Sequence, residues 1–581
     1  MNWRECFNDP VLHVVIVGFH HKKGCQVEYA YPPLIEGNSH ESNECPKQWK
    51  HLPSLALPDG AHNYSEDTIY FHLPSLANSS VTIYGVSCYR QIDASEVINK
   101  QDDVTRNTVQ KSVCILSKLP VYGLIQVKLE MITHAYFVGR DFGQVDLMKE
   151  TYETLNKSLI ESLSQHFHVH LGLSCRDILK QFKHKLLILF KLLMLEKKVL
   201  FFSSPVKPIC TTILTLVSLF PEMLENGLTN SSDYIPIART SSSSSSSGPQ
   251  ISGGGCGSSC SSKNVDSSSS SGSATTSTTA VATTTATTTT YSSLNTTDND
   301  DDDDDGDVKN DNVPNNDGRG DANDDDDDDD DFEAGGYDDD YGMPLSLFTK
   351  GVLCHPYLSL HLYDILSDAC VRGFVIGATN ALFMQRKQYL DVIVELAEFK
   401  VEILDPELKK ALQLSTADLR FIDNLVKCVD DDNKGDPFLD NTGWEGGDDW
   451  VRSQFKSYLL SLLATVASRE ERLLEDFNTS FISAWKLTNN YKQWQAKGPY
   501  QHLADIKPEH VCKGQLSMSD VKLKINQVMN LRSGNSKKIN AVVNQTEKVV
   551  SQTGKAVGAA VGLAKSTVSS WFSGLTAQKE Q

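Results

Sequence analysis

One stretch of this chain, residues 238–340, constrains the fold more than any other because it consists mainly of Ser, Thr, Gly and Asp runs. Such runs bury too little apolar surface to offset the entropy of ordering the chain, so the sequence predicts a disordered stretch. Within it, residues 298–340 hold 22 Asp and one Glu against one Lys and one Arg, which equals the net charge of −21 of the whole chain. The remainder is therefore charge-balanced, which argues against a nucleic-acid partner.

A disordered stretch of this length is either a boundary between domains or an insertion inside one. Lengthening a loop from ~10 to ~100 residues costs about 2 kcal/mol of closure entropy, so a surface loop tolerates it. The strand predicted at 199–203 needs partners, and strand patterns after residue 340 can supply them. We therefore expect a long disordered insertion within one α/β domain.

The segment before this insertion begins with strand patterns in residues 11–137. Strands are predicted at 14–17, 26–31, 68–74, 81–92 and 111–120, and a helix is predicted at 123–137. The helix is indicated by apolar residues that recur at helical spacing, which are Leu124, Val127, Met131 and Ile132. The segment Asp59-Gly60-Ala61-His62-Asn63 resembles a fragment of a catalytic loop, but an Asp-Gly pair more often forms a turn, so a turn is favoured here.

The segment His20-His21-Lys22-Lys23-Gly24-Cys25 connects the first two of these strands. It could be a metal site, a phosphate loop or a plain hairpin turn. No second Cys/His pair lies nearby to complete a zinc site, and a strand follows where a phosphate loop needs a helix. We favour the plain hairpin, whose exposed lysines could still contact a partner.

Two apolar runs, 186–195 and 209–220, raise the question of a membrane span. Each is shorter than the ~20 residues that a span needs. We interpret them as buried helices around a buried strand, within a helix, helix, strand, helix order for 140–235. After the insertion, 371–383 is predicted as a strand pair with a Gly/Asn turn.

Residues 405–495 are expected to be mostly helical. Asp405 is the predicted N-cap of the first helix, with Pro406 at its first position. A second helix is expected at 448–466, with acids in its first turn. The segment 443–449 before it is either a contact loop or a rigid helix start.

The chemistry-bearing residues give little sign of catalysis. His166, His168 and His170 would share a face of a strand, but zinc sites usually add Cys or acidic ligands, so solvated histidines are favoured. No phosphate-loop, dinucleotide or nucleophile-elbow motif is present. We therefore predict no catalytic residue, no metal and no cofactor.

Cellular location is suggested by two further features. The thirteen cysteines, an odd number, are scattered without a framework, as is typical of reduced thiols in a cytosolic protein. The first residues lack an apolar signal core, so we expect no secretory entry.

The tail, residues 515–581, contains the clearest candidate binding feature. On a helix turning about 100° per residue, its apolar side chains fall in an arc roughly 100° wide, opposite a face of mostly Ser, Thr and Gly, as in lipid-packing sensors. The residues predicted to bind membranes are Val550, Val557, Val561, Val568, Trp571, Phe572 and Leu575, and Ala564 lies in the same arc. The alternatives are a disordered tail, or a coiled coil through positions 557, 561, 564, 568, 571 and 575.

Several long strings resemble a known module. Residues 182–205, FKHKLLILFKLLMLEKKVLFFSSP, resemble the centre of the DENN module, and 13–34 and 57–74 resemble its N-terminal part. The strings YGMPLSLFTKGVLCHPYLSL, VRGFVIGATNALF, TADLRFIDNLV, GWEGGDDWVRSQF and SAWKLTNNYKQW narrow this to the Avl-nine group of late-secretory-pathway proteins. The resemblance covers nearly the whole chain except the insertion.

This resemblance implies a tripartite α/β architecture. Its parts would be a longin-like α/β part at 11–137, a central α/β part at 140–237 and 341–402, and a helical C-terminal part at 405–500. The insertion at 238–340 and the amphipathic tail at 515–581 would lie outside these three parts.

The resemblance also implies a function. DENN modules typically bind Rab-type small GTPases, and many are guanine-nucleotide exchange factors. The Avl-nine group is associated with exocytic transport from the Golgi, recycling endosomes, cell polarity and migration. We expect a cytoplasmic protein attached peripherally to secretory or recycling membranes. It would act through a Rab, with or without exchange, or as a membrane-associated scaffold without exchange activity; an enzyme with its own active site ranks third.

Overall fold

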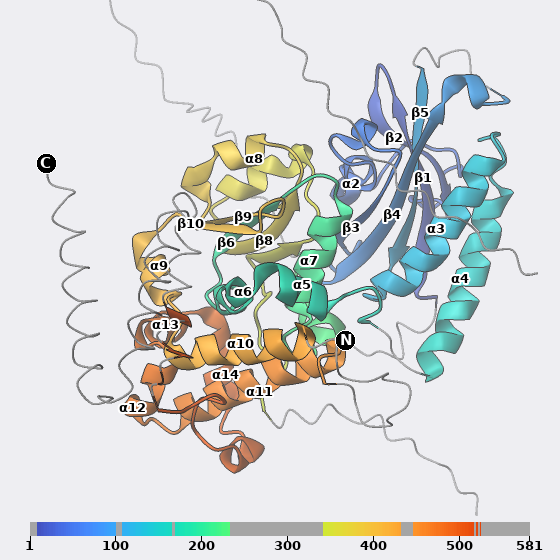
Figure 1. Cartoon of the computed structure of the whole chain (residues 1–581). Helices are drawn as coiled ribbons and strands as arrows, with labels where there is room; N and C mark the ends of the chain where they lie inside the picture. Colours follow the sequence, from blue (N-terminus) through green and yellow to red (C-terminus); the bar gives the residue numbers. More distant parts are fainter. Residues whose placement is uncertain are drawn as a thin grey trace, which may run out of the picture. The chain divides into compact units, whose positions relative to one another are not determined.

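The computed structural model describes residues 9–99, 107–165, 169–232, 341–430 and 445–515, with residues 517, 519, 520, 523 and 524. The predicted disordered insertion, most of the predicted amphipathic tail, and His166 and His168 lie outside the described residues. The described residues are mixed α/β and form two five-stranded sheets with many helices (Figure 1).

The first sheet is antiparallel throughout and has the strand order β2-β1-β5-β4-β3. Its strands are β1 (Val11–His20), β2 (Gly24–Tyr31), β3 (Glu66–Pro74), β4 (Thr82–Asp93) and β5 (Thr108–Ser117). The predicted hairpin is confirmed, because β1 pairs with β2 across the turn at 21–23. The strands predicted at 68–74, 81–92 and 111–120 are confirmed as β3, β4 and β5.

The helices on this sheet are α2 (Leu52–Ala56), α3 (Tyr122–Val138) and α4 (Asp146–Gln165), and α7 (Lys207–Val217) contacts its edge strand β3. Figure 1 shows α3 beside α4, where α3 contacts β4 and β5 and α4 contacts β1. The helix predicted at 123–137 is confirmed. The residues buried on that helix are Tyr122, Gly123, Ile125, Leu129, Thr133, Tyr136 and Phe137.

The four apolar residues that recur at helical spacing lie on a more exposed face of α3. Val127 and Met131 are exposed, and Leu124 and Ile132 are only partly buried. The helix is apolar around most of its circumference, so periodicity alone does not select a face. The sheet takes the face with the aromatic rings of Tyr136 and Phe137, which bury the most surface.

The second sheet has the order β10-β9-β6-β8-β7. Its strands are β6 (Lys198–Phe202), β7 (Val352–His355), β8 (Gly373–Ala378), β9 (Val392–Glu395) and β10 (Lys400–Ile403). β6 pairs in parallel with β8 and β9, so one strand before residue 233 lies among strands that follow residue 340. The predicted buried strand at 199–203 is confirmed.

The strand pair predicted at 371–383 is wrong. Only β8 forms there, and the chain continues into α8 (Leu382–Gln385). β8 lies between β6 and β7 and is parallel to both. Parallel neighbours require long crossovers, so a Gly/Asn hairpin has no place at this position.

In the sequence, β6 follows α5 (Cys175–Phe182) and α6 (His184–Met194) and precedes α7 (Lys207–Val217). Three helices, α4 to α6, therefore precede the strand, where two were predicted. Every residue of α6 from Leu186 to Met194 is buried, so this apolar run belongs to the protein core. None of the helices in the described residues is both long enough and apolar enough to cross a membrane.

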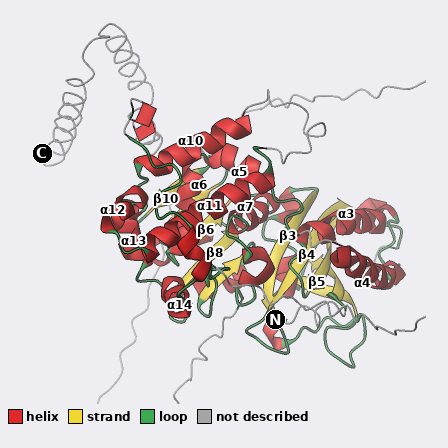
Figure 2. Cartoon of the chain, turned by 90° about the horizontal axis from the view of Figure 1, so that it is seen from below, coloured by secondary structure: helices red, strands yellow, loops and turns green. Residues whose placement is uncertain are grey.

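The helical part packs on α5 and α6 through α10 and α11 (Figure 2). It comprises α9 (Pro406–Ala411), α10 (Thr416–Asp430), α11 (Asp448–Ala467), α12 (Glu471–Leu474), α13 (Thr479–Trp485) and α14 (Asn489–Lys497). The predicted cap is confirmed, because the Asp405 side chain accepts the N–H of Glu407. Asp448 and Asp449 lie in the first turn of α11, as predicted.

Short turns connect these elements. The 3-10 turns are η1 (Lys47–Trp49), η2 (Ala61–Asn63), η3 (Ala94–Glu96), η5 (Leu360–Ser367), η6 (Lys387–Tyr389), η7 (Glu475–Phe477) and η8 (Gln501–Asp505), and η4 (Met223–Gly227) is a π-helical turn.

A buried polar network joins the helical part to α6. Lys191 Nζ lies 2.6 Å from Asp418 Oδ2, and the Tyr458 hydroxyl donates to Asp418 Oδ1 at 2.7 Å. His510 Nε2 lies 3.3 Å from the same Oδ1 atom. Burial lowers the pKa of Lys191 although Asp418 opposes this shift, so the charged form of the lysine depends on that carboxylate.

Candidate functional site

The turn at Asp59 joins the first sheet to the part of the chain that follows the insertion. The Asp59 N–H donates to the Tyr357 hydroxyl at 2.8 Å, and Asp59 Oδ2 accepts the N–H of Leu360 at 2.8 Å. The Thr379 hydroxyl donates to the Asp59 carbonyl at 2.9 Å. Gly60 follows with a φ of +81°, which a glycine adopts without strain. The predicted Asp-Gly turn is confirmed and fixes the two sheets to one another.

β3 makes a second attachment at the start of α7. Asp67 Oδ2 accepts the N–H of Val206 at 2.7 Å, and Asp67 Oδ1 accepts the N–H of Lys207 at 3.1 Å. Burial raises the pKa of this carboxyl, and the backbone N–H groups partly offset the shift. These bonds satisfy donors that a helix start leaves without intrahelical partners.

His72 makes a third attachment, between β3 and β7. Its Nδ1 lies 2.7 Å from the Cys354 carbonyl oxygen, and its Nε2 lies 2.6 Å from the Tyr122 hydroxyl. Burial lowers the pKa of His72 to about 3, so the ring is neutral at physiological pH. A neutral ring with Nδ1–H donating to the carbonyl and Nε2 accepting from Tyr122 satisfies both contacts.

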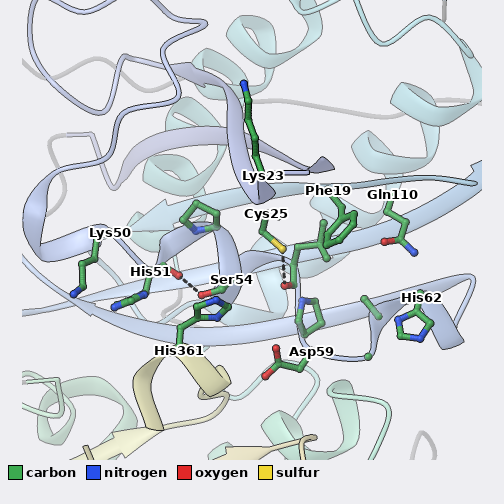
Figure 3. A pocket seen from close by; sticks show the side chains of 16 residues that line it. Phe19, Lys23, Cys25, Lys50, His51, Ser54, Asp59, His62, Gln110 and His361 are labelled. Carbon is green, nitrogen blue, oxygen red and sulfur yellow. Dashed lines mark hydrogen bonds between the residues drawn. The ribbon is translucent and has the colours of Figure 1, made fainter. Parts of the chain in front are cut away.

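A pocket of about 320 Å³ lies beside the Asp59 turn (Figure 3). The β1–β2 hairpin contributes Phe19, Lys23 and Cys25, and η5, beyond the insertion, contributes His361. Other lining residues come from 50–62 and from β5. Figure 3 shows His51 close to His361 at one end of the pocket, and their ring centroids are 6.0 Å apart. The pocket is therefore built by both sides of the junction.

The pocket lining is basic. It includes Lys23, Lys50, His51, His62 and His361, and Asp59 is its one acidic side chain. Burial, Lys50 and His361 together lower the pKa of His51, so this ring is neutral at neutral pH. A surface of this kind complements an acidic partner.

The reactive groups in the pocket do not suit catalysis. Burial raises the pKa of the Cys25 thiol to about 11, and the sulfur lies 3.9 Å from the Leu57 carbonyl oxygen. Such a thiol is protonated at neutral pH and is a poor nucleophile. Among the residues that the structure describes, no three His, Cys, Asp or Glu side chains are grouped to hold a metal ion. The side chains that line the pocket are better suited to binding a partner than to a chemical reaction.

The histidines considered in the sequence have structural partners where they are described. The backbone N–H groups of Lys22 and Lys23 each lie 3.1 Å from His20 Nδ1, and the rings of His20 and His21 stack. This ordering fits the predicted plain turn. His170 contacts Glu225 at 3.7 Å. The predicted membrane-binding residues from Val550 to Leu575 lie outside the described residues.

Sequence reasoning did not find the pocket. Lys50, His51 and His361 carry no local motif, and His361 is separated from the other two by about 300 residues of sequence. The string LPDGAHN at 57–63 was the available signal, but a turn residue gives no indication of its distant partners.

The fold and the site define an α/β protein whose two sheets are fixed together beside a pocket lined mainly by basic side chains. The chain belongs to the Avl9 family: the family model described as "Transport protein Avl9" matches residues 11–466. This confirms the resemblance to the Avl-nine group.

Two relatives illustrate the match. "Late secretory pathway protein avl9" of Schizosaccharomyces pombe is 26% identical over 522 residues, which cover 87% of this chain and 90% of that protein. "Late secretory pathway protein AVL9" of Saccharomyces cerevisiae is 26% identical over 556 residues, which cover 88% of this chain but 61% of the yeast protein.

Proposed function

We propose that this chain is a DENN-type membrane-trafficking protein that binds a Rab-type small GTPase. It would act in late secretory transport from the Golgi to the plasma membrane or in transport through recycling endosomes, with roles in polarity and cell migration. Membership of the Avl9 family and the names of its two relatives support the late secretory assignment. The resemblance to DENN modules supports the GTPase partner.

The observation that carries this proposal is the composite basic pocket. Lys23 and Lys50 come from the first sheet and its connections, and His361 comes from beyond the insertion. A GTPase that docks across the junction would contact both parts at once. Asp59 and Asp67 hold these parts in fixed relative positions, which reduces the entropy cost of binding.

Nucleotide exchange would require no nucleophile of this chain. An exchange factor binds the nucleotide-free GTPase more tightly than the loaded form, and this difference in affinity speeds nucleotide release. The pocket offers positive charge and shape without an activated thiol, which suits that role. A scaffold would bind the GTPase with equal affinity in both states and leave the release rate unchanged.

Membrane attachment completes the proposal. The chain would lie on the cytoplasmic face of secretory or recycling membranes and be held peripherally by the apolar residues of its tail, with Trp571 and Phe572 as the bulkiest.

The test is capture of purified Rabs by the full chain, in nucleotide-free and GTP-loaded forms, followed by release of a fluorescent GDP analogue. We expect preferential capture of a nucleotide-free Rab and accelerated release. Lys23→Glu with Lys50→Glu should lower capture by roughly tenfold, because repulsion replaces attraction at the contact. Lys149→Glu with Lys157→Glu changes the charge equally on exposed positions of α4 and should have little effect.

Two outcomes would change this reading. Capture without any acceleration of release would replace exchange with the scaffold function. Failure to capture any Rab in either form would refute the GTPase proposal.

A further inference from the structure

The outer face of α3 carries an apolar stripe, which consists of Leu124, Val127, Met131 and Val138. Val127 is 53% exposed, Met131 62% and Val138 63%, and Leu124 is half-buried. Leu171, which is 44% exposed, lies at one end, where its carbonyl closely approaches Gly123. Neighbouring exposed apolar side chains of this kind mark interaction surfaces more often than lone ones do.

The polar neighbours of the α3 stripe are already engaged on both sides. Lys128 bonds to Ser158 of α4, and Glu130 lies 3.1 Å from Lys207 of α7. Gln126 donates to Glu130 at 2.8 Å. Polar side chains that already have partners therefore lie on both sides of the α3 stripe. This arrangement resembles the apolar centre and polar rim of a protein interface.

The spacing of the α3 stripe matches one kind of ligand. Residues 124, 127, 131 and 138 fall on the a/d positions by which one helix packs against another, and the a/d position between the last two is His134, whose Nδ1 lies 2.8 Å from an Arg90 guanidinium nitrogen. Docking on the stripe therefore requires a second helix with the same seam.

The tail of this same chain contains such a seam. Its apolar residues are separated alternately by four and three positions, and they are Val557, Val561, Ala564, Val568, Trp571 and Leu575. At 1.5 Å per residue the tail seam would extend about 27 Å and the α3 stripe about 21 Å. The two seams are therefore compatible in pattern and in length.

The connection between the two seams is a long segment of the same chain. Residues 525–556 link the last described residue, Lys524, to Val557. This link could extend up to about 110 Å when stretched, and it would span roughly 30 Å on average as a flexible coil. A tether that spans its two sites raises their effective concentration, which favours even a weak helix contact within one chain.

We propose that residues 557–575 form a helix that docks on the α3 stripe when the protein is off the membrane. Val568 and Trp571 cannot be buried against α3 and inserted in a bilayer at the same time. The docked state therefore competes with membrane attachment. This proposal does not rest on GTPase binding.

Site-specific photo-crosslinking in the full chain tests the contact. Benzoylphenylalanine at position 127 should crosslink within the same chain to peptides of 557–575. The same probe at position 487, where Leu487 is 75% exposed in the helical part, should not reach them. Crosslinks between two chains would overturn the proposal in favour of self-association, and absence of tail crosslinks from position 127 would overturn it outright.

Limited trypsin digestion supplies a second readout that needs neither lipid nor GTPase. Lys565 lies inside the docked segment, so the full chain should be cut there slowly. Val127→Glu with Met131→Glu should speed that cut by roughly tenfold, because it places two charges in the docked interface. Both side chains are exposed in α3, so the melting temperature of this variant should equal that of the wild-type protein. Leu487→Glu is the matched control, and equal cutting rates in all three proteins would refute docking.

Discussion

Lys191 and Asp418, which are 227 positions apart in the sequence, form an ion pair in which neither side chain has any solvent exposure. The lysine comes from α6, which precedes β6 of the second sheet in the sequence, and the aspartate comes from α10 of the helical part. Lys191 also donates to the Phe477 carbonyl at 3.2 Å. The pair therefore connects two regions that the sequence separates by the whole insertion.

Removing one charge of this buried pair should strongly lower the stability of the fold. Asp418→Asn leaves Lys191 buried without a counter-charge, and we expect a loss of about 3–5 kcal/mol in the free energy of unfolding, measured with urea. Asp423→Asn on the same helix breaks only the largely exposed contact with Lys427 and should cost less than about 1 kcal/mol. Equal effects of the two variants would contradict a special role for the buried pair.

Stability should fall in mild acid because of His72. Its pKa is about 3 in the folded protein and 6.5 for an ordinary solvated histidine, so the unfolded chain binds the extra proton between these values. The contribution of neutral His72 is complete above pH ~6.5 and is lost as the pH falls towards 3; by pH 5 the loss is about 2 kcal/mol.

Urea unfolding at several pH values tests this assignment. His72→Phe should be less stable at pH 8, because the Tyr122 hydroxyl and the Cys354 carbonyl lose their partner. Its stability should also depend less steeply on pH between 6.5 and 5. Replacing the exposed His62 by Phe should leave the wild-type slope. An unchanged slope in His72→Phe would assign the acid sensitivity to other groups.

Deletion of residues 238–340 should leave the fold intact. The sequence of this stretch cannot supply a core, so the melting temperature should change little when the flanking ends are joined by a short linker. Protease should cut the full chain there first. The two fragments should then remain together on gel filtration, because β6 pairs with β8 and β9. Separation of the fragments would argue against a shared sheet.

Membrane binding by the tail should depend on insertion more than on charge. Trp571→Ser with Phe572→Ser should strongly reduce association with small vesicles, since burying each aromatic side chain contributes roughly 1.5–3 kcal/mol. Salt at about 0.15 M should change binding little. A peptide of residues 545–577 should gain helical circular dichroism with small vesicles.

Other results with the tail would assign it a different role. Binding only to anionic vesicles, abolished by salt, would replace insertion with attraction by lysines. A helical dimer in buffer without a lipid response would support the coiled coil.

The sequence by itself determined the features that depend on near neighbours. The hairpin at 20–25, the cap at Asp405 and the buried strand at 199–203 are fixed by turn chemistry, capping and hydrophobic runs within a few residues. Family membership could also be predicted from the sequence, because long strings such as 182–205 resemble those of the family.

Tertiary structure alone decided which surfaces meet. α3 is apolar on two faces, and the sheet selected the one with Tyr136 and Phe137, leaving Val127 and Met131 outside. β8 became a parallel strand because its partners are β6 and β7, which no local pattern specifies. Lys50 and His361 line the same pocket because segments far apart in the sequence pack together. Such contacts depend on the free energy of packing distant segments together, and spacing along the sequence does not encode it.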